Sequence, residues 1–453
     1  MTGTFRRFAI GAVVALAVTV AAAVATVRAR RSPPDVILIG VDTLRADHLR
    51  CYGYARDTSP TIDALAARGT LFENCLAPIP RTTQSVASIL TGREPFHHGV
   101  RYLNEKLPDA ERTLADLLAA RGYRTIGVTA SGFVSGAFDR RFQDIDGTPG
   151  EWPARETTDR AIRALARAPK GPVFLFVFYR DPHMPYAPPE LSFDRDYRGR
   201  FRDAIAYVPS KGEMVYKNSM TPREREHAVA LYDSEIRYAD GEIARLLAAV
   251  EARGRKTVVV FTADHGEAFG EDGVYYDHGD LLDDAALRVP LVVTGIRFPA
   301  KRITRLARLI DVTPTVLAGL GIAVLDARFD GVDLASAARN GAPDLDAFAE
   351  TGDALLAETF AMGRRALDGI RGRPRALTAG RWRAIWFPRP GGVDHHLYDL
   401  ARDPLQRRDL YPRPDQEALF RRLAERVARD DPGQAAKPLS EEEVKRLRAL
   451  GYL

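Results

Sequence analysis

The stretch Asp35-Val-Ile-Leu-Ile-Gly-Val-Asp42 contains the pattern that decides the fold of this chain. Its apolar part is continuous and rich in β-branched residues, whereas a strand with one face in water alternates apolar and polar residues. Continuous runs of this kind are typical of strands buried on both faces, as in parallel sheets. The segments Val173–Phe178 and Thr257–Phe261 have the same character. Together the three runs predict a buried, mostly parallel sheet.

Amphipathic segments with the apolar spacing of helices alternate with these runs. The clearest are Thr61–Arg68, Arg112–Arg121, Thr157–Arg167 and Arg223–Arg253. The strand-like segment Pro290–Thr294 and the segment Pro314–Leu320 continue the pattern. Alternating strands and helices predict an α/β fold, with a central mostly parallel sheet flanked by helices.

The character of the sequence changes near residue 340. Short β-like segments appear at Arg381–Trp386 and His395–Leu400. Further on, Ser440-Glu-Glu-Glu443 has the spacing of a capping box, and Gly451 is placed to end the helix that follows. We therefore predict a large domain at 34–339 and a small α+β subdomain at 340–453.

The composition is that of an ordinary globular protein, with 45% hydrophobic and 28% charged residues among 453. The formal net charge of +5 comes from 65 basic and 60 acidic residues spread along the whole chain. No block of basic residues marks a nucleic-acid-binding arm, so we expect no nucleic-acid partner. The two cysteines, Cys51 and Cys75, are compatible with a disulfide and equally with two unrelated thiols.

Residues 1–31 contain a long apolar segment. Phe8–Val27 has no charged residue, and arginines, among them Arg7 and Arg28, flank both of its ends. Its length fits a bilayer span and exceeds the apolar core of most secretory signals, so we predict an uncleaved transmembrane helix. A cleaved signal peptide is the alternative, because Ala23-Val-Ala25 resembles a cleavage site.

Two predicted strands are followed directly by polar groups. Asp42 follows the first strand, and Asp264 and His265 follow the strand that begins at Thr257. In open α/β sheets, ligands bind at the carboxyl ends of parallel strands, so these side chains can converge. Two carboxylates and an imidazole suit a divalent cation. Taken singly, each residue is more often an ordinary loop or turn residue.

The segment from Arg81 to Gly92 predicts a loop that enters a short helix. Thr82 would lie at the start of this helix, where unpaired N–H groups and the positive end of the helix dipole stabilise an alkoxide and the anion that it attacks. The simpler interpretation is that Thr82 only caps the helix. His183 and His278 are candidates for holding a substrate oxygen or protonating a leaving group, although most isolated loop histidines are only surface residues.

An ordered series of motifs runs from about residue 34 to the C-terminus: Val41-Asp-Thr-Leu-Arg-Ala-Asp47, Cys51-Tyr-Gly-Tyr54, Thr58-Ser-Pro60, Ser85 to Gly92, Pro95-Phe-His-His-Gly99, Asp181-Pro-His-Met-Pro-Tyr186, Asp264-His-Gly-Glu267, Arg288-Val-Pro-Leu291, Asp311-Val-Thr-Pro-Thr315, Tyr398-Asp-Leu-Ala-Arg-Asp-Pro404 and Leu450-Gly-Tyr-Leu453. In these motifs the chain resembles the sulfatase branch of the alkaline-phosphatase superfamily. The resemblance implies a large α/β catalytic domain, a small C-terminal domain, and cleavage of a sulfate or phosphate ester.

The chain departs from the sulfatase pattern at the nucleophile. Counting back from Thr91-Gly92 places Thr82 in the position of the family's Cys or Ser, and Val86 in the position of its arginine. Formylglycine, the aldehyde of typical sulfatases, is made only from Cys or Ser, so none is expected here. Threonine in this position is similar to the phosphoethanolamine and glycerol-phosphate transferases of bacterial envelopes, where it forms a covalent phospho-enzyme.

The metal ligands depart in the same direction. The resemblance implies a first shell of Asp42, Thr82, Asp264 and His265 around one divalent metal cation. The nitrogen ligand favours Zn or Mn over Ca or Mg. Thr82 would attack sulfur or phosphorus, while His183 and His278 balance the developing charge and assist the leaving group.

Three functions are compatible with these features. The first is a metal-dependent hydrolase of sulfate or phosphate esters that acts through a covalent threonine intermediate. The second is a phosphoethanolamine- or glycerol-phosphate-type transferase of the cell envelope, and the third is a non-catalytic binding domain. With a single N-terminal span, the catalytic domain would lie on the outer side of the cytoplasmic membrane, where a lipid-linked or glycan ester is the expected substrate.

Overall fold

The computed structural model describes residues 33–147, 151–205, 220–271, 275–295, 298–323, 328–337, 344–351, 372–389 and 392–430. The predicted membrane anchor at 1–31 and the predicted terminal helix after Ser440 lie outside these ranges. Within them, no helix is both long and apolar enough to cross a bilayer. Cys51 and Cys75 are both free thiols, so the structure contains no disulfide between them.

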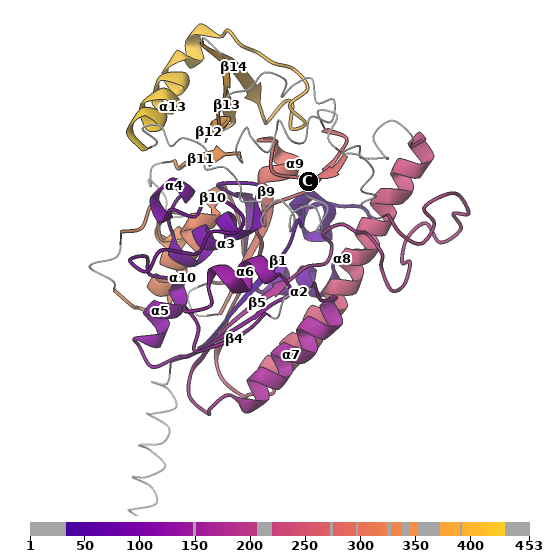
Figure 1. The fold of residues 1–453 in the computed structure, drawn as a ribbon, viewed down its shortest axis with the longest axis vertical. Coiled ribbons are helices and arrows are strands. Elements are labelled where there is room, and N and C mark those ends of the chain that lie inside the picture. The colour runs from indigo at the N-terminus through magenta and orange to yellow at the C-terminus, as the bar shows by residue number, and fades with distance from the viewer. Residues whose placement is uncertain are drawn as a thin grey trace, which may run out of the picture.

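In the described part of the chain, eight strands form the central sheet (Figure 1). In spatial order they are β10 (Lys301–Arg308), β2 (Thr70–Leu76), β9 (Arg288–Thr294), β6 (Thr257–Ala263), β1 (Asp35–Val41), β5 (Val173–Tyr179), β3 (Arg124–Thr129) and β4 (Asp144–Asp146). Strand β9 pairs antiparallel with β6 and β2, and the remaining pairings are parallel. The mostly parallel sheet predicted from the sequence is confirmed.

The strands at the centre of the sheet are buried over their whole length. Every residue of β1 and β5 is buried, and β6 is buried from its second residue onward. The predicted bounds of the first strand, Asp35–Val41, are those of β1. Helices cover both faces of the sheet, so neither face is exposed to water and the strands have no alternating polar residues. For this reason continuous apolar runs identified these strands.

Two groups of helices cover the sheet and lie on its two sides in Figure 1. One group comprises α2 (Pro60–Arg68), α7 (Ala154–Arg167) and α8 (Pro222–Glu251). The other comprises α3 (Thr82–Thr91), α5 (Leu114–Ala119), α6 (Gly132–Ala137) and α10 (Val312–Gly319). Helix α5 is shorter than the predicted Arg112–Arg121, because a capping box formed by Thr113 and Asp116 starts it at Leu114.

A second, antiparallel sheet lies beyond one end of the central sheet (Figure 1). Its described strands are β11 (Asp346–Glu350), β12 (Arg375–Ala379), β13 (Trp382–Arg389) and β14 (Gly392–Asp399), and α13 (Glu417–Asp430) packs on it. The two β-like segments predicted in this region correspond to β13 and β14. The domain division at 340 stays a prediction, since residues 338–343 are outside the described ranges.

An apolar cluster joins the two sheets. Leu76 and Leu287 from the large sheet's side pack with Ala347, Ala376 and Ile385 from the small sheet. This shared core fixes the small sheet over the edge of the central sheet at which β2 ends and β9 begins.

Candidate active site

Asp42 and Asp264 lie side by side because their strands are in register. Val41 at the end of β1 pairs with Ala263 at the end of β6, so the next residue of each chain segment leaves the sheet at the same level. Both carboxylates are buried. This is the edge at which the sequence predicted convergence, and the structure brings the two carboxylates together with His265.

The two carboxylates are only partly hydrogen-bonded. Asp264 Oδ1 accepts hydrogen bonds from the backbone N–H groups of Thr43, at 3.2 Å, and His265, at 2.8 Å. In the described structure Asp264 Oδ2 and Asp42 Oδ1 have no hydrogen-bond partner. Burial raises the pKa of both groups, and for Asp42 the neighbouring Asp264 charge raises it further. Buried oxygens without partners are costly, so these two are suited to accept a positively charged ligand.

His265 presents an unprotonated nitrogen to this pair. Its Nδ1 lies 2.9 Å from the carbonyl oxygen of Gly266, a contact that only an N–H can satisfy. The other nitrogen, Nε2, therefore carries the lone pair in the neutral ring, and it lies 3.3 Å from Asp264 Oδ2 and 3.9 Å from Asp42 Oδ1. Burial lowers the pKa of His265 to about 4, so the ring is neutral at neutral pH.

Thr82 completes the cluster from the first turn of α3. Its Oγ1 lies 3.3 Å from His265 Nε2. The Ser85 hydroxyl donates a 2.6 Å hydrogen bond to the carbonyl oxygen of Asp264, which ties the start of α3 to the end of β6. Gly92 ends the helix with a φ of 69°, as the sequence predicted. The four predicted first-shell residues thus belong to one buried cluster.

The donor set fits a single divalent cation. One ligand atom each from Asp42, Asp264 and His265 can be chosen so that all lie within 4.8 Å of one another. Two carboxylate oxygens without protein partners and one imidazole nitrogen are ligands that such an ion takes. An ion among them would neutralise the two buried charges.

His278 and His183 lie beside this cluster. The ring centroid of His278 is 4.4 Å from that of His265 and 5.1 Å from that of His183. His278 Nδ1 lies 3.1 Å from Glu267 Oε1, and His183 Nδ1 lies 2.5 Å from the carbonyl oxygen of Met184. Burial lowers the pKa of His183 well below its usual value. Both predicted histidines therefore reach the site, each held at one nitrogen.

The family model described as Sulfatase matches residues 34–322, which is more than half of the chain. The chain belongs to the sulfatase family. This family lies within the alkaline-phosphatase superfamily, so the resemblance drawn from the motifs is confirmed at that level.

Sulfatases and related hydrolases are among the similar proteins. The chain is 27% identical to the iduronate 2-sulfatase of Mus musculus over 57% of this chain, and 23% identical to the Delta 4,5-hexuronate-2-O-sulfatase of Bacteroides thetaiotaomicron over 84% of this chain and 85% of that protein. The phosphonate monoester hydrolase of Agrobacterium radiobacter has a similar fold, with a TM-score of 0.68 and 20% identity over 90% of this chain and 99% of that chain. The match spans 59% of the length of the mouse iduronate 2-sulfatase.

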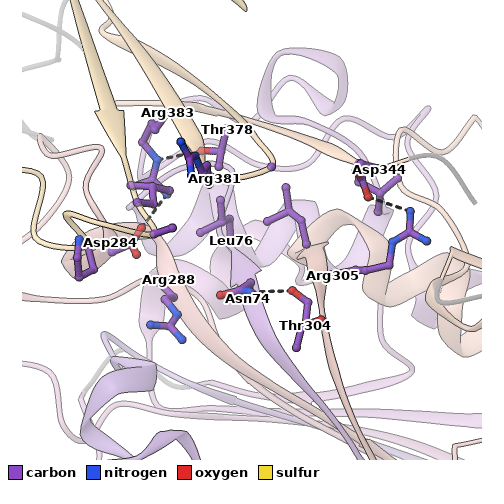
Figure 2. A pocket seen from close by; sticks show the side chains of 16 residues that line it. Asn74, Leu76, Asp284, Arg288, Thr304, Arg305, Asp344, Thr378, Arg381 and Arg383 are labelled. Atoms are coloured by element: carbon purple, nitrogen blue, oxygen red, sulfur yellow. Dashed lines mark hydrogen bonds and ion pairs between the residues drawn. The ribbon is translucent and has the colours of Figure 1, made fainter. Parts of the chain in front are cut away.

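A separate cavity of about 400 Å³ lies where the two sheets of this sulfatase-family protein meet. None of the predicted site residues lines it. Its lining includes four arginines, and acidic or backbone groups bind them: Arg305 pairs with Asp344, and Arg383 with Asp284 (Figure 2). The remaining two are Arg288 and Arg381. We call this cavity the seam cavity.

Two site residues had no predicted role. Glu267 stands in the Asp264-His-Gly-Glu267 motif, but its contact with His278 depends on the return of the chain through β7 (Ala268–Phe269) and β8 (Tyr275–Asp277). Arg81 precedes Thr82 directly and is 3% exposed. A basic residue next to a predicted nucleophile is the signal that could have identified it.

Proposed function

We propose that this sulfatase-family protein is a metal-dependent hydrolase of sulfate or phosphate esters whose nucleophile is the unmodified hydroxyl of Thr82. One observation carries the proposal: Thr82 Oγ1 lies 3.3 Å from a histidine nitrogen that also faces two buried carboxylate oxygens without hydrogen-bond partners. A nucleophile beside a metal-ligand set at a helix start is the arrangement required for group transfer from an anionic ester.

In the proposed reaction, Asp42, Asp264 and His265 would hold one divalent cation together with Thr82. Such a cation would lower the pKa of the Thr82 hydroxyl and withdraw electrons from the ester. The Thr82 hydroxyl gives its proton to solvent, its oxygen bonds to sulfur or phosphorus, and the bond from that atom to the leaving alcohol breaks. His278, positioned by Glu267, takes up a proton at its other ring nitrogen and gives it to the departing oxygen, while the neutral His183 ring lies beside it.

The second half of the reaction decides between hydrolysis and transfer. A threonine ester has no second hydroxyl on its carbon from which the group could be expelled, so release requires attack on sulfur or phosphorus itself. Water as the attacking group completes a hydrolase, and an acceptor alcohol completes a transferase. Hydrolysis is favoured by the names of the relatives, which are sulfatases and a phosphonate monoester hydrolase.

The proposed substrate is an ester of sulfate or phosphate on a glycan or on a lipid-linked molecule. The Bacteroides thetaiotaomicron relative is named for a sulfate on a hexuronate sugar, which supports the glycan class. We further propose that residues 1–31 anchor the chain and place the catalytic domain outside the cytoplasmic membrane. Protease added to spheroplasts would then digest the catalytic domain. Protection of the domain would show that it lies on the cytoplasmic side.

The test is an assay of the purified full chain with aryl sulfate, aryl phosphate monoester and aryl phosphate diester, each with Zn, Mn, Ca or Mg. Thr82→Ala should lower kcat/KM by at least about 10³-fold. Thr83→Ala is the matched control, since the neighbouring Thr83 hydroxyl donates to the carbonyl oxygen of Leu103. Mass spectrometry of acid-quenched enzyme should find the covalent group on the peptide that carries Thr82. Full activity of Thr82→Ala, or an adduct elsewhere, would identify another nucleophile.

A further inference from the structure

Arg81 is a buried cation with unused hydrogen-bonding capacity. It precedes Thr82 directly and occupies the N-cap position of α3 in an extended conformation. Its side chain is 4% exposed, and its Nε has no hydrogen-bond partner in the described part of the chain. The carboxylate paired with it, Asp280, is 3.8 Å from Nη2, well beyond the length of a charge-assisted hydrogen bond.

The loop that contains His278 packs closely against this guanidinium. Gly279 has a φ of +105°, and a Cβ added to it would lie 2.1 Å from both Cζ and Nε of Arg81. The guanidinium therefore lies directly against the backbone between His278 and Asp280. Since the His278 ring is 4.4 Å from that of His265, the same loop joins Arg81 to the candidate metal ligands.

No other residue of α3 can supply this charge. Val86, in the position of the family's arginine, is fully buried in the apolar core. The remaining residues of the helix, Thr82–Thr91, are uncharged. In this segment, Arg81 is thus the positively charged side chain that an anionic ester at Thr82 could contact. The N–H groups of the first turn of α3 would contact the same ester.

A guanidinium left with a free N–H in a buried place is costly unless an acceptor reaches it. The oxygens of a tetrahedral sulfate or phosphate group suit its planar fork. A merely structural Arg81 would instead be expected to use Nε on an acceptor of the chain, as Arg383 of the second sheet does when its Nε donates to the Thr378 hydroxyl.

We propose that Arg81 binds a non-bridging oxygen of the ester group and holds its sulfur or phosphorus atom beside the Thr82 hydroxyl. This inference rests on the proposed function, because it assigns the anion-binding residue of the same site. It also gives Gly279 a role, since any side chain there would displace the guanidinium.

The experiment measures anion binding and turnover separately. Inorganic sulfate and inorganic phosphate are titrated by calorimetry into the metal-loaded full chain, and KM and kcat are measured with the best aryl ester. Arg81→Gln should weaken binding of the preferred anion at least about tenfold and raise KM, while Arg81→Lys should fall between it and the wild type. Arg93→Gln is the control: Arg93 lies beyond the other end of α3 and pairs with Glu111.

Each result decides between the two claims. If the wild type cleaves esters but Arg81→Gln binds both anions as tightly and keeps the wild-type KM, the Arg81 site is wrong and the proposed function stands. If the wild type cleaves no ester but Arg81→Gln still weakens anion binding, the reaction is wrong and the Arg81 site stands. Lost turnover with unchanged anion binding would show that Arg81 only positions the His278 loop, and a wild type that binds neither anion would also overturn the inference.

Discussion

Two regions at the same edge of the central sheet contain buried charged side chains. In one region an opposite charge pairs with the buried charge, and in the other two like charges lie side by side. At the seam cavity, Arg383 is fully buried, yet its guanidinium donates to Thr378 at 2.9 Å and Gln406 at 2.7 Å and pairs with Asp284 at 2.8 Å. At the active site, Asp42 and Asp264 are equally buried, but each keeps one oxygen without a partner in the described structure.

This difference distinguishes charges that stabilise the fold from charges that are suited to bind a ligand. A buried charge that is paired with an opposite charge is destabilising to break, whereas two buried like charges that each keep an unpaired oxygen are destabilising to keep. Proteins retain such local conflicts mainly where function needs them. On this account, substitution should lower stability at the seam cavity and lower activity at the strand ends.

The largest expected effect is at the active site. Asp264→Ala should lower kcat/KM by about 10³-fold or more, since it removes a metal ligand and the anchor of the His265 and Thr43 N–H groups. The metal-free variant should lose less stability than Arg383→Met does, because removing one of two repelling carboxylates offsets part of the loss of these two hydrogen bonds. A variant with wild-type activity would refute the assignment of Asp264.

The next effect is at the seam cavity. Arg383→Met should lower the free energy of unfolding by about 3–5 kcal/mol, because Asp284 and the side chain of Gln406 lose their buried partner. Activity per folded molecule should stay within a few-fold of the wild type. Urea denaturation measures the stability, and active-site titration of the folded fraction measures the activity. A large loss of turnover without a loss of stability would contradict the purely stabilising role of Arg383.

A pH effect tests a poorly satisfied acid at the contact between α13 and the large domain. Arg426 of α13 donates to Glu94 Oε1 at 3.1 Å, while Glu94 Oε2 has no partner among the described residues. Burial raises the pKa of Glu94 from 4.5 to about 7. A raised folded-state pKa gives stability that is present below pH 4.5 and is lost as the pH rises to about 7, by up to about 3 kcal/mol. In Glu94→Gln this part of the pH dependence should disappear.

The smallest effect is expected at the exposed side of the seam cavity. Arg381 pairs with Asp399 at 3.3 Å, but its side chain is 46% exposed. Arg381→Gln should therefore change the free energy of unfolding by less than about 1 kcal/mol and leave turnover unchanged. A loss as large as that of Arg383→Met would mean that solvent exposure does not determine how much each ion pair contributes to the free energy of unfolding.

Much of the active site could be predicted because local sequence fixes it. The apolar run Asp35–Val41 predicts a buried strand, and the parallel pairing of β1 with β6 places Asp42 beside Asp264. The helix start at Thr82 could be placed from Gly92, whose left-handed conformation ends α3. Each of these inferences depends on short-range patterns or on the rule that parallel strands end at one edge.

The rest depends on long-range pairing that no local pattern encodes. The antiparallel direction of β9 follows from how it fits between β6 and β2, not from its own residues. Apart from the nearby Thr378, the partners of Arg383 are Leu282, Asp284 and Gln406, which lie farther away in the sequence. The fit of Arg81 against Gly279 likewise requires two loops to meet, so neither residue identifies the other from the sequence.

The most direct measurement of the central claim is metal stoichiometry with its effect on stability. Full-length wild type and Asp264→Asn are purified, stripped of metal, titrated with Zn, Mn, Ca and Mg, and followed by elemental analysis and thermal unfolding. The account predicts one metal per wild-type chain and a rise in Tm with metal concentration, with neither in Asp264→Asn. If the wild type binds no metal, or the variant binds it equally well, the unpaired carboxylates at the strand ends are not a metal site.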